Sequence, residues 1–105
     1  PATKIDQVVE AIATHWPGET PKTTEAKLLH DANLLDSLGA IGVVRLSIGA
    51  FFWYQYKSLK EVIDLIKDYR NKSELLILSK SKEMAKVRVK FMDELIKEVD
   101  KEEHI

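Results

Sequence analysis

Apolar residues recur at helical spacing along most of this chain, and this periodicity restricts the possible fold more than any other feature. The first apolar stripe lies on one helix face and consists of Ile5, Val8, Val9, Ile12 and Trp16. The pair Pro17-Gly18 is expected to end that helix, because neither residue continues a helix well. A polar segment follows, so we expect the chain to open with one amphipathic helix and then a loop, with a short turn of helix over 24–30 as an alternative within it.

Three further helices are expected after this loop. One runs from about Ser37 to Phe52, although its glycines and β-branched residues leave a strand over 41–48 as an alternative. The next begins after Ser58, which forms a capping box with Glu61, and ends near Lys72. A long helix over 73–103 is indicated by the stripe Leu75, Leu78, Met84, Val87, Phe91, Leu95 and Val99. The expected fold class is therefore all-α, a small four-helix bundle with an extra long C-terminal helix.

Length and composition limit the classes of function. The chain has 105 residues, which suits a single helical domain over 1–105. Its formal net charge is −1, so no overall positive field attracts nucleic acid or an anionic membrane. Because it has no cysteine and no signal-peptide pattern, we expect a cytoplasmic protein without disulfides. The most apolar stretch, Leu38 to Tyr56, includes Arg45 and three glycines, so no stable membrane insertion is expected.

The most specific motif is Leu29-His30-Asp31-Ala32-Asn33-Leu34-Leu35-Asp36-Ser37-Leu38-Gly39. It places a serine directly after an aspartate, between apolar residues, at an expected helix start. A hydroxyl in that position is exposed, and the unpaired backbone N–H groups of a helix N-terminus favour a phosphate. The motif resembles the phosphopantetheine attachment site of acyl carrier proteins, and it is closest to the D-alanyl carrier type.

The resemblance covers residues 4–70 and implies a carrier-like bundle. Such a bundle has a first helix, a long loop (here about 17–36) and a second helix that the modified serine, Ser37, opens. Asn33 stands where the family usually has glycine, and we expect it in a left-handed conformation. Asp36 is expected to cap the second helix. The implied cofactor is 4'-phosphopantetheine on Ser37, with Asp36 facing the modifying enzyme and helping to hold its Mg²⁺.

The function implied by the resemblance is that of a non-catalytic carrier, which holds acyl or aminoacyl groups as thioesters for lipid or cell-envelope biosynthesis. Its partners would be a phosphopantetheinyl transferase and the enzymes that transfer the acyl groups. The residues expected at the partner surface are Leu38, Ile41, Arg45 and Trp53. No catalytic residue, metal site or nucleic-acid contact is expected in the chain itself.

Other interpretations of the same residues stay open. Asp36 and Ser37 are also ordinary helix-capping residues, and His30 beside Asp31 lacks a second ligand at metal-binding spacing. The aromatic run 51–56 is expected to enter the core, with an exposed partner-binding patch as the alternative. A second hypothesis is therefore a small helical-bundle protein-binding module of immunity, antitoxin or adaptor type. A third is a membrane-associated helical protein, based on Leu38–Tyr56.

Overall fold

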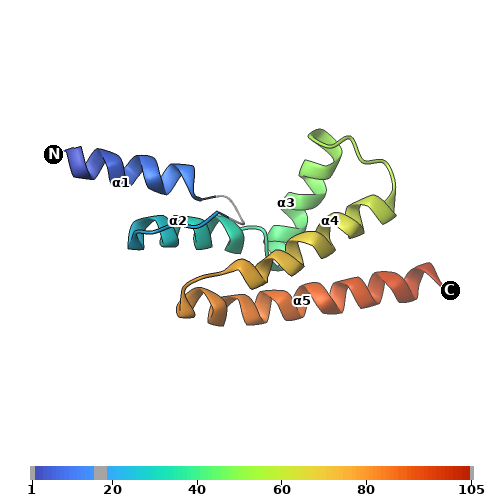
Figure 1. Cartoon of the computed structure of the whole chain (residues 1–105). Helices are drawn as coiled ribbons and strands as arrows, with labels where there is room; N and C mark the ends of the chain where they lie inside the picture. The colour runs from blue at the N-terminus through green and yellow to red at the C-terminus, as the bar shows by residue number, and fades with distance from the viewer. Residues whose placement is uncertain (1, 16–18, 105) are drawn as a thin grey trace.

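The computed structural model describes residues 2–15 and 19–104, and within them the chain is all-α (Figure 1). The helices are α1 (Ala2–Ala13), α2 (Thr24–Leu35), α3 (Gly39–Phe52), α4 (Leu59–Lys72) and α5 (Ser79–Glu103). A short 3₁₀ turn, η1 (Ser73–Leu75), follows α4. The expected all-α class is confirmed, and the strand alternative over 41–48 is wrong because those residues lie inside α3. The expectations for Trp16 and for the Pro17-Gly18 helix stop lie outside the described residues.

The molecule is elongated. Its principal extents are 62 × 30 × 18 Å and its radius of gyration is 15.9 Å, whereas a compact chain of about 100 residues has roughly 13 Å. Figure 1 shows the reason: α1 and α2 form one end, α4 and α5 run antiparallel at the other, and α3 projects from the middle. An elongated chain of this size buries a smaller part of its apolar surface than a compact one.

The main core lies where α2, α3, α4 and α5 meet. Its buried members are Leu34, Leu35, Leu38, Ile66, Leu76, Ala85 and Met92. The inner faces of α3, α4 and α5 add half-buried side chains, namely Val43, Leu46, Val62, Ile63, Val89 and Ile96. An ion pair closes the α4–α5 interface, because Arg70 donates to both carboxylate oxygens of Asp93 at 2.7 and 3.0 Å. The corner between α2 and α3 is thereby fixed to the α4–α5 pair.

The segment expected as a long loop contains a complete helix, α2. Thr23 caps it, since its Oγ1 accepts from the Ala26 N–H at 3.0 Å. Glu10 of α1 fixes the same turn by accepting from the Lys22 N–H and the Thr23 hydroxyl. The buried face of α2 follows helical spacing through Ala26, His30, Asp31, Leu34 and Leu35. The loop prediction is wrong here, and the short turn expected over 24–30 is the first part of a twelve-residue helix. Two of the five inward positions are polar, which hid the periodicity.

The start of the next helix also differs from the expectation. α3 begins at Gly39, with Leu38 as its N-cap, so neither Ser37 nor Asp36 opens or caps it. Asp36 is instead the C-cap of α2. Asn33 lies inside α2, and the left-handed conformation belongs to Gly39 at φ 79°. The physical reason is that Asn33 is an ordinary helical residue of α2. The left-handed residue that turns the chain towards α3 is therefore Gly39, six residues later.

The predictions for α4 are confirmed and those for α5 are confirmed in part. Ser58 caps α4, because its Oγ accepts from the Glu61 N–H at 3.1 Å, and the helix ends at Lys72. α5 begins at Ser79 rather than 73, since η1 and an extended link come first. Its buried positions are Ser81, Ala85 and Met92, so the expected stripe is rotated and its members Met84, Val87 and Phe91 are exposed.

Burial of the aromatic run is the clearest wrong expectation. Phe51, Phe52, Trp53 and Tyr54 are all more than half exposed at the outer end of α3. The apolar stripe of α1 is exposed as well, at Ile5, Val8, Val9 and Ile12. The cause is geometric: α3 projects away from the rest of the chain, and α1 contacts α2 without turning its stripe inward. Much apolar surface therefore lacks an internal partner.

Candidate functional site

Ser37, the expected attachment point, lies at the corner between α2 and α3, whose axes bend by 75°. Its backbone N–H donates to the Leu34 carbonyl at 3.0 Å, and that of Leu38 donates to Leu35 at 3.1 Å. Both groups therefore complete the end of α2 and are not available to a phosphate. Ser37 is half-buried and lies two residues before α3.

Two arginines surround this corner. Arg88 of α5 donates to the Leu35 carbonyl at 2.7 Å, and its aliphatic stem lies against Gly39. Arg45 of α3 lies 3.6 Å from the carboxylate of Asp36, and both side chains are well exposed. An exposed pair at this distance contributes little to stability and exchanges readily for other partners. The corner thus combines one hydroxyl with a loosely paired charge of each sign.

The corner is tightly packed at its backbone. A Cβ added to Gly42 would lie 2.3 Å from the Ser37 carbonyl carbon and 2.6 Å from its oxygen. Only glycine lets the second turn of α3 approach the Ser37 peptide this closely. Gly42 therefore sets the position of Ser37 relative to α3.

The residues expected at a partner surface do not lie together. Leu38 is 2% exposed and belongs to the core, so it is not presented to a partner. Ile41 on α3 is 68% exposed, and Trp53, the residue that follows the end of α3, is 85% exposed. Ile41 and the exposed Arg45 thus lie one turn apart on α3, whereas Trp53 follows the far end of this helix.

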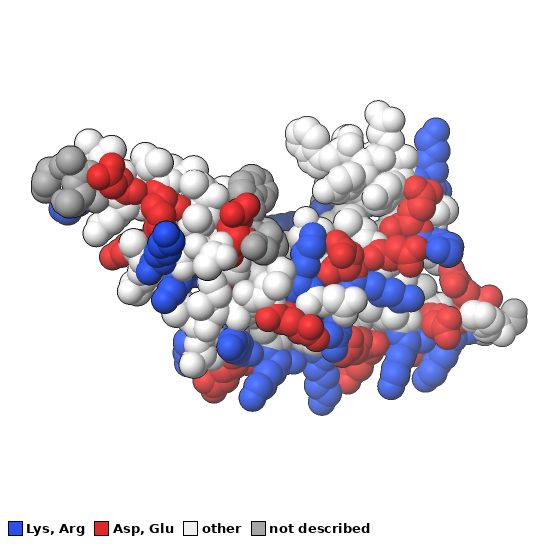
Figure 2. Space-filling model, in the orientation of Figure 1, with Lys and Arg blue, Asp and Glu red and all other residues white. Residues whose placement is uncertain are grey.

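The outward side of α3, together with the two residues that follow it, is apolar apart from the exposed Arg45. We call the following residues the α3 face: Ile41, Val44, Ile48, Phe51, Phe52, Trp53 and Tyr54, each more than half exposed. The opposite side of α3, with Gly42, Val43, Leu46 and Ala50, packs against the body of the protein. A helix that is apolar on all sides is normally buried on all sides. In Figure 2 the projecting end of α3 carries no charged atoms until the basic side chain at its margin.

The end of α3 is a well-defined aromatic cluster. Phe51 and Phe52 meet edge to face with ring centres 5.4 Å apart, and Tyr54 stacks on Tyr56 at 5.3 Å. Gln55 takes a left-handed conformation, with φ 55°, so that the Tyr56 N–H reaches the Ala50 carbonyl at 2.9 Å. This conformation is costly for a residue other than glycine, and such strain occurs most often at functional sites.

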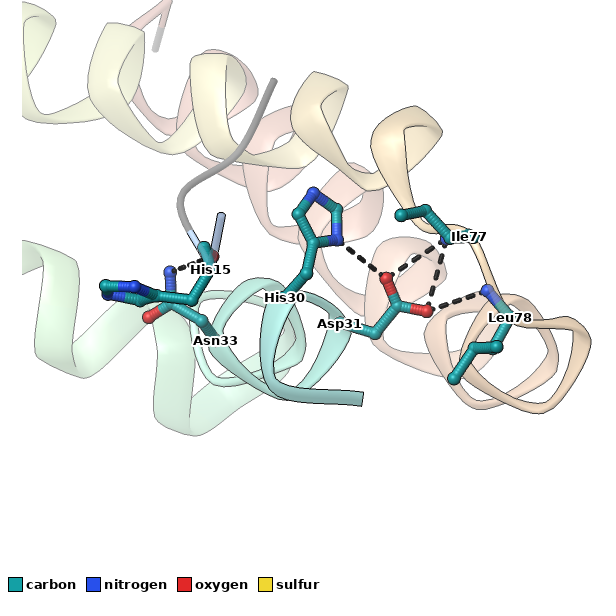
Figure 3. A network of polar contacts seen from close by, with 6 residues as sticks. All are labelled: His15, His30, Asp31, Asn33, Ile77 and Leu78. Carbon is teal, nitrogen blue, oxygen red and sulfur yellow. Dashed lines mark hydrogen bonds and ion pairs between the residues drawn. The ribbon is translucent and has the colours of Figure 1, made fainter. Parts of the chain in front are cut away.

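A buried polar network joins α2 to the start of α5 (Figure 3). Asp31, which is 1% exposed, accepts from the N–H groups of Ile77 and Leu78 at 2.8–3.2 Å. His30 Nδ1 donates to the same carboxylate at 2.9 Å. Burial raises the pKa of Asp31, but the hydrogen bonds from Leu78, His30 and Ile77 lower it more, so the net pKa lies below its usual value. Asp31 therefore caps α5 as an anion, in place of a local capping side chain.

This role of Asp31 was missed from the sequence. The only local signal was the i, i+4 spacing of Ala26, His30 and Leu34, which places the His-Asp pair on the inner side of α2. His30 also borders a hollow of about 310 Å³, together with Pro21, Leu75 and Ile77. The N–H groups that Asp31 binds lie more than forty residues away in the sequence, so local patterns could not reveal this contact.

Two further kinds of site are absent from the part of the chain that the structure describes. Within residues 2–15 and 19–104, no group of three or more His, Asp or Glu side chains is placed to hold a metal ion. In the same residues no single helix has both the length and the apolar character needed to cross a membrane; α2 and α3 reach that limit only as a bent pair. No protein-family model, curated protein or solved structure matches this chain.

Proposed function

We propose that this chain is a protein-binding module and that the α3 face is its docking surface. The observation that supports this proposal is a helix that is apolar on both sides but covered on only one. The face contains four exposed aromatic side chains in sequence, Phe51 to Tyr54. Aromatic residues supply most of the binding energy at protein interfaces, where clusters of them form hot spots.

The size of the α3 face also supports a protein partner. Its exposed side chains present roughly 700 Å², taking about 200 Å² for a whole aromatic side chain and about 100 Å² for an aliphatic one. The largest apolar patch on an ordinary monomer covers about 300–600 Å². Each side of a standard protein–protein interface contributes about 800 Å². The α3 face is therefore of the size that a stable protein interface requires.

The experiment compares two isoleucines of equal exposure in the cells that produce the protein. Ile41 on the α3 face is 68% exposed, and Ile5 on α1 is 67% exposed. Wild-type protein is expected to migrate as an assembly larger than one 12.0 kDa chain in a native separation. Ile41→Asp is expected to return it to the size of one chain, and Ile5→Asp to leave the assembly intact. Wild-type protein of single-chain size, or an Ile41→Asp protein that stays assembled, would contradict the proposal.

The carrier function of Ser37 is the second candidate, and one observation favours it. Ser37 is half-buried beside the exposed Asp36 and lies two residues before α3, whose first N–H groups have no partner within the helix. A phosphodiester on its Oγ would lie near those groups and near Arg45. Two N–H groups that such a site would use, those of Ser37 and Leu38, already bind α2. For this reason we place the carrier second.

Intact mass tests the carrier candidate. The folded protein is incubated with coenzyme A and a phosphopantetheinyl transferase, so that the Ser37 hydroxyl displaces the nucleotide and takes the pantetheine arm. A mass gain of one arm that Ser37→Ala abolishes and Ser47→Ala leaves unchanged would support it. An unchanged mass for the folded wild-type protein would rule it out, and the protein-binding proposal would not be affected.

A further inference from the structure

We infer that the partner of the α3 face is a second copy of this chain, so that two α3 helices pack against each other across a two-fold axis. The inference rests on the proposed function, since it names the partner for the same surface. A symmetric pair needs a surface that is complementary to itself. Three properties of the α3 face meet that need: its spacing, its charge and its accessibility.

The spacing of the α3 face is that of a helix–helix seam. Ile41, Val44, Ile48 and Phe51 are separated by three, four and three residues. This is the alternation of a and d positions in a coiled coil, with β-branched isoleucines at both a positions. The same helix already uses a second seam, through Val43 and Leu46, to pack on the rest of its own chain. A second helix is therefore the natural occupant of the exposed seam.

The charge of the α3 face allows two copies to meet. From Leu38 to Tyr56 the only charged side chain is Arg45, and Asp36 of the same chain lies 3.6 Å from it. Two copies of this face would therefore bring together apolar side chains with little repulsion between like charges. A partner recognised by charge would find only one cation on this surface, Arg45, with the carboxylate of Asp36 beside it. The complementary surface is another apolar seam of the same kind.

The arrangement of the helices leaves the seam accessible. Figure 1 shows α3 projecting from the elongated body, with its aromatic end far from α1, α2 and α5. The four seam residues present roughly 300 Å² of the α3 face, and Phe52, Trp53 and Tyr54 present the rest. If the aromatic end is covered together with the seam, the roughly 700 Å² on each copy is close to the share of about 800 Å² per partner in a standard interface.

Sedimentation equilibrium of the purified chain tests the inference. We expect a species of twice the 12.0 kDa chain mass that dissociates on dilution. Ile48→Asp is expected to raise the dissociation constant at least about a hundredfold, because each copy would bury an unpaired carboxylate in the seam. Ile12→Asp on α1 is the matched control, since Ile12 and Ile48 are exposed to nearly the same extent. It is expected to leave the dimer unchanged, and far-ultraviolet circular dichroism checks that both variants keep their helices.

Each other outcome has a distinct meaning. A monomer at every concentration would overturn the inference, and so would a dimer that Ile12→Asp dissociates and Ile48→Asp does not. If Ile48→Asp does not fold, Val44→Asp places the same charge one turn away on the same seam. If the pure chain is monomeric while its cellular assembly still depends on Ile41, the proposed function stands and the partner is a different protein. If neither the cellular nor the purified protein assembles, both fail.

Discussion

Replacing Gly42 with alanine is the sharpest test of the corner between α2 and α3. The added Cβ would lie 2.3 Å from the Ser37 carbonyl carbon, more than an ångström inside normal contact. The obstacle is backbone, so it cannot rotate aside as a side chain could. Overpacking costs about 1–3 kcal/mol and a rigid obstacle belongs at the upper end, while alanine recovers about 1 kcal/mol of helix propensity. We expect a net loss of about 2 kcal/mol, or a melting temperature about 10 °C lower.

Gly49→Ala is the matched control on the same helix. Its Cβ would meet only the Trp53 ring, at an ordinary 3.7 Å. The helix-propensity gain of about 1 kcal/mol should then appear undiminished, raising the melting temperature by about 5 °C. Thermal unfolding followed at 222 nm measures both variants. If Gly42→Ala melts at or above the wild-type temperature, the close approach of Ser37 to α3 is wrong, and the description of the corner fails with it.

Three further variants test other parts of the account. Asp31→Asn should cost about 2 kcal/mol at neutral pH in urea unfolding, because it replaces a charge-assisted cap. The folded pKa of Asp31 lies below its usual 3.8. The stabilisation that its charge provides is therefore complete above pH 3.8 and is lost as the pH falls through the folded pKa. The difference in unfolding free energy between Asp31→Asn and wild type should narrow in acid, and a constant difference would contradict the anionic cap. Arg88→Met keeps an aliphatic stem over Gly39 but removes the donor to the Leu35 carbonyl, which should lower the unfolding free energy by about 1 kcal/mol in the same assay. An unchanged unfolding free energy would show that this hydrogen bond does not stabilise the protein. Gln55→Gly should stabilise the protein by about 1 kcal/mol by relieving its left-handed conformation, and a destabilised variant would refute the strain.

The elements that could be predicted from sequence are those whose signals are local. α4 has a capping residue at Ser58, an apolar stripe and a defined end at Lys72, so its bounds were predicted well. α2 was expected only as a short turn over 24–30, because its inner face carries His30 and Asp31. The Asp31 carboxylate is satisfied in the interior by hydrogen bonds from Ile77 and Leu78, far along the chain. The end of α2 and the start of α3 could not be placed correctly without knowing that α2 continues through Asn33.

The candidate surface shows a different limit. The sequence placed Ile41 in an apolar helix and Trp53 just beyond the end of that helix, and it offered both burial and partner binding for the aromatic run. Which of the two applies depends on the direction in which α3 leaves the corner, and no local pattern encodes that direction. The rotated stripe of α5 has the same cause: Ala85 and Met92 face inward because α3 and α4 approach from that side. Exposed positions such as Val87 satisfied the helical period equally well.

The most direct test of the central claim, that the α3 face is a docking surface, is site-specific photo-crosslinking in the cells that produce the protein. A photoreactive amino acid replaces Ile41 in one protein and Ile5 in another, two positions of nearly equal exposure. The account predicts a single discrete adduct from position 41 that disappears when Ile48→Asp is added, and no discrete adduct from position 5. An uncrosslinked chain at position 41, or the same mixture of adducts from both positions, would contradict it.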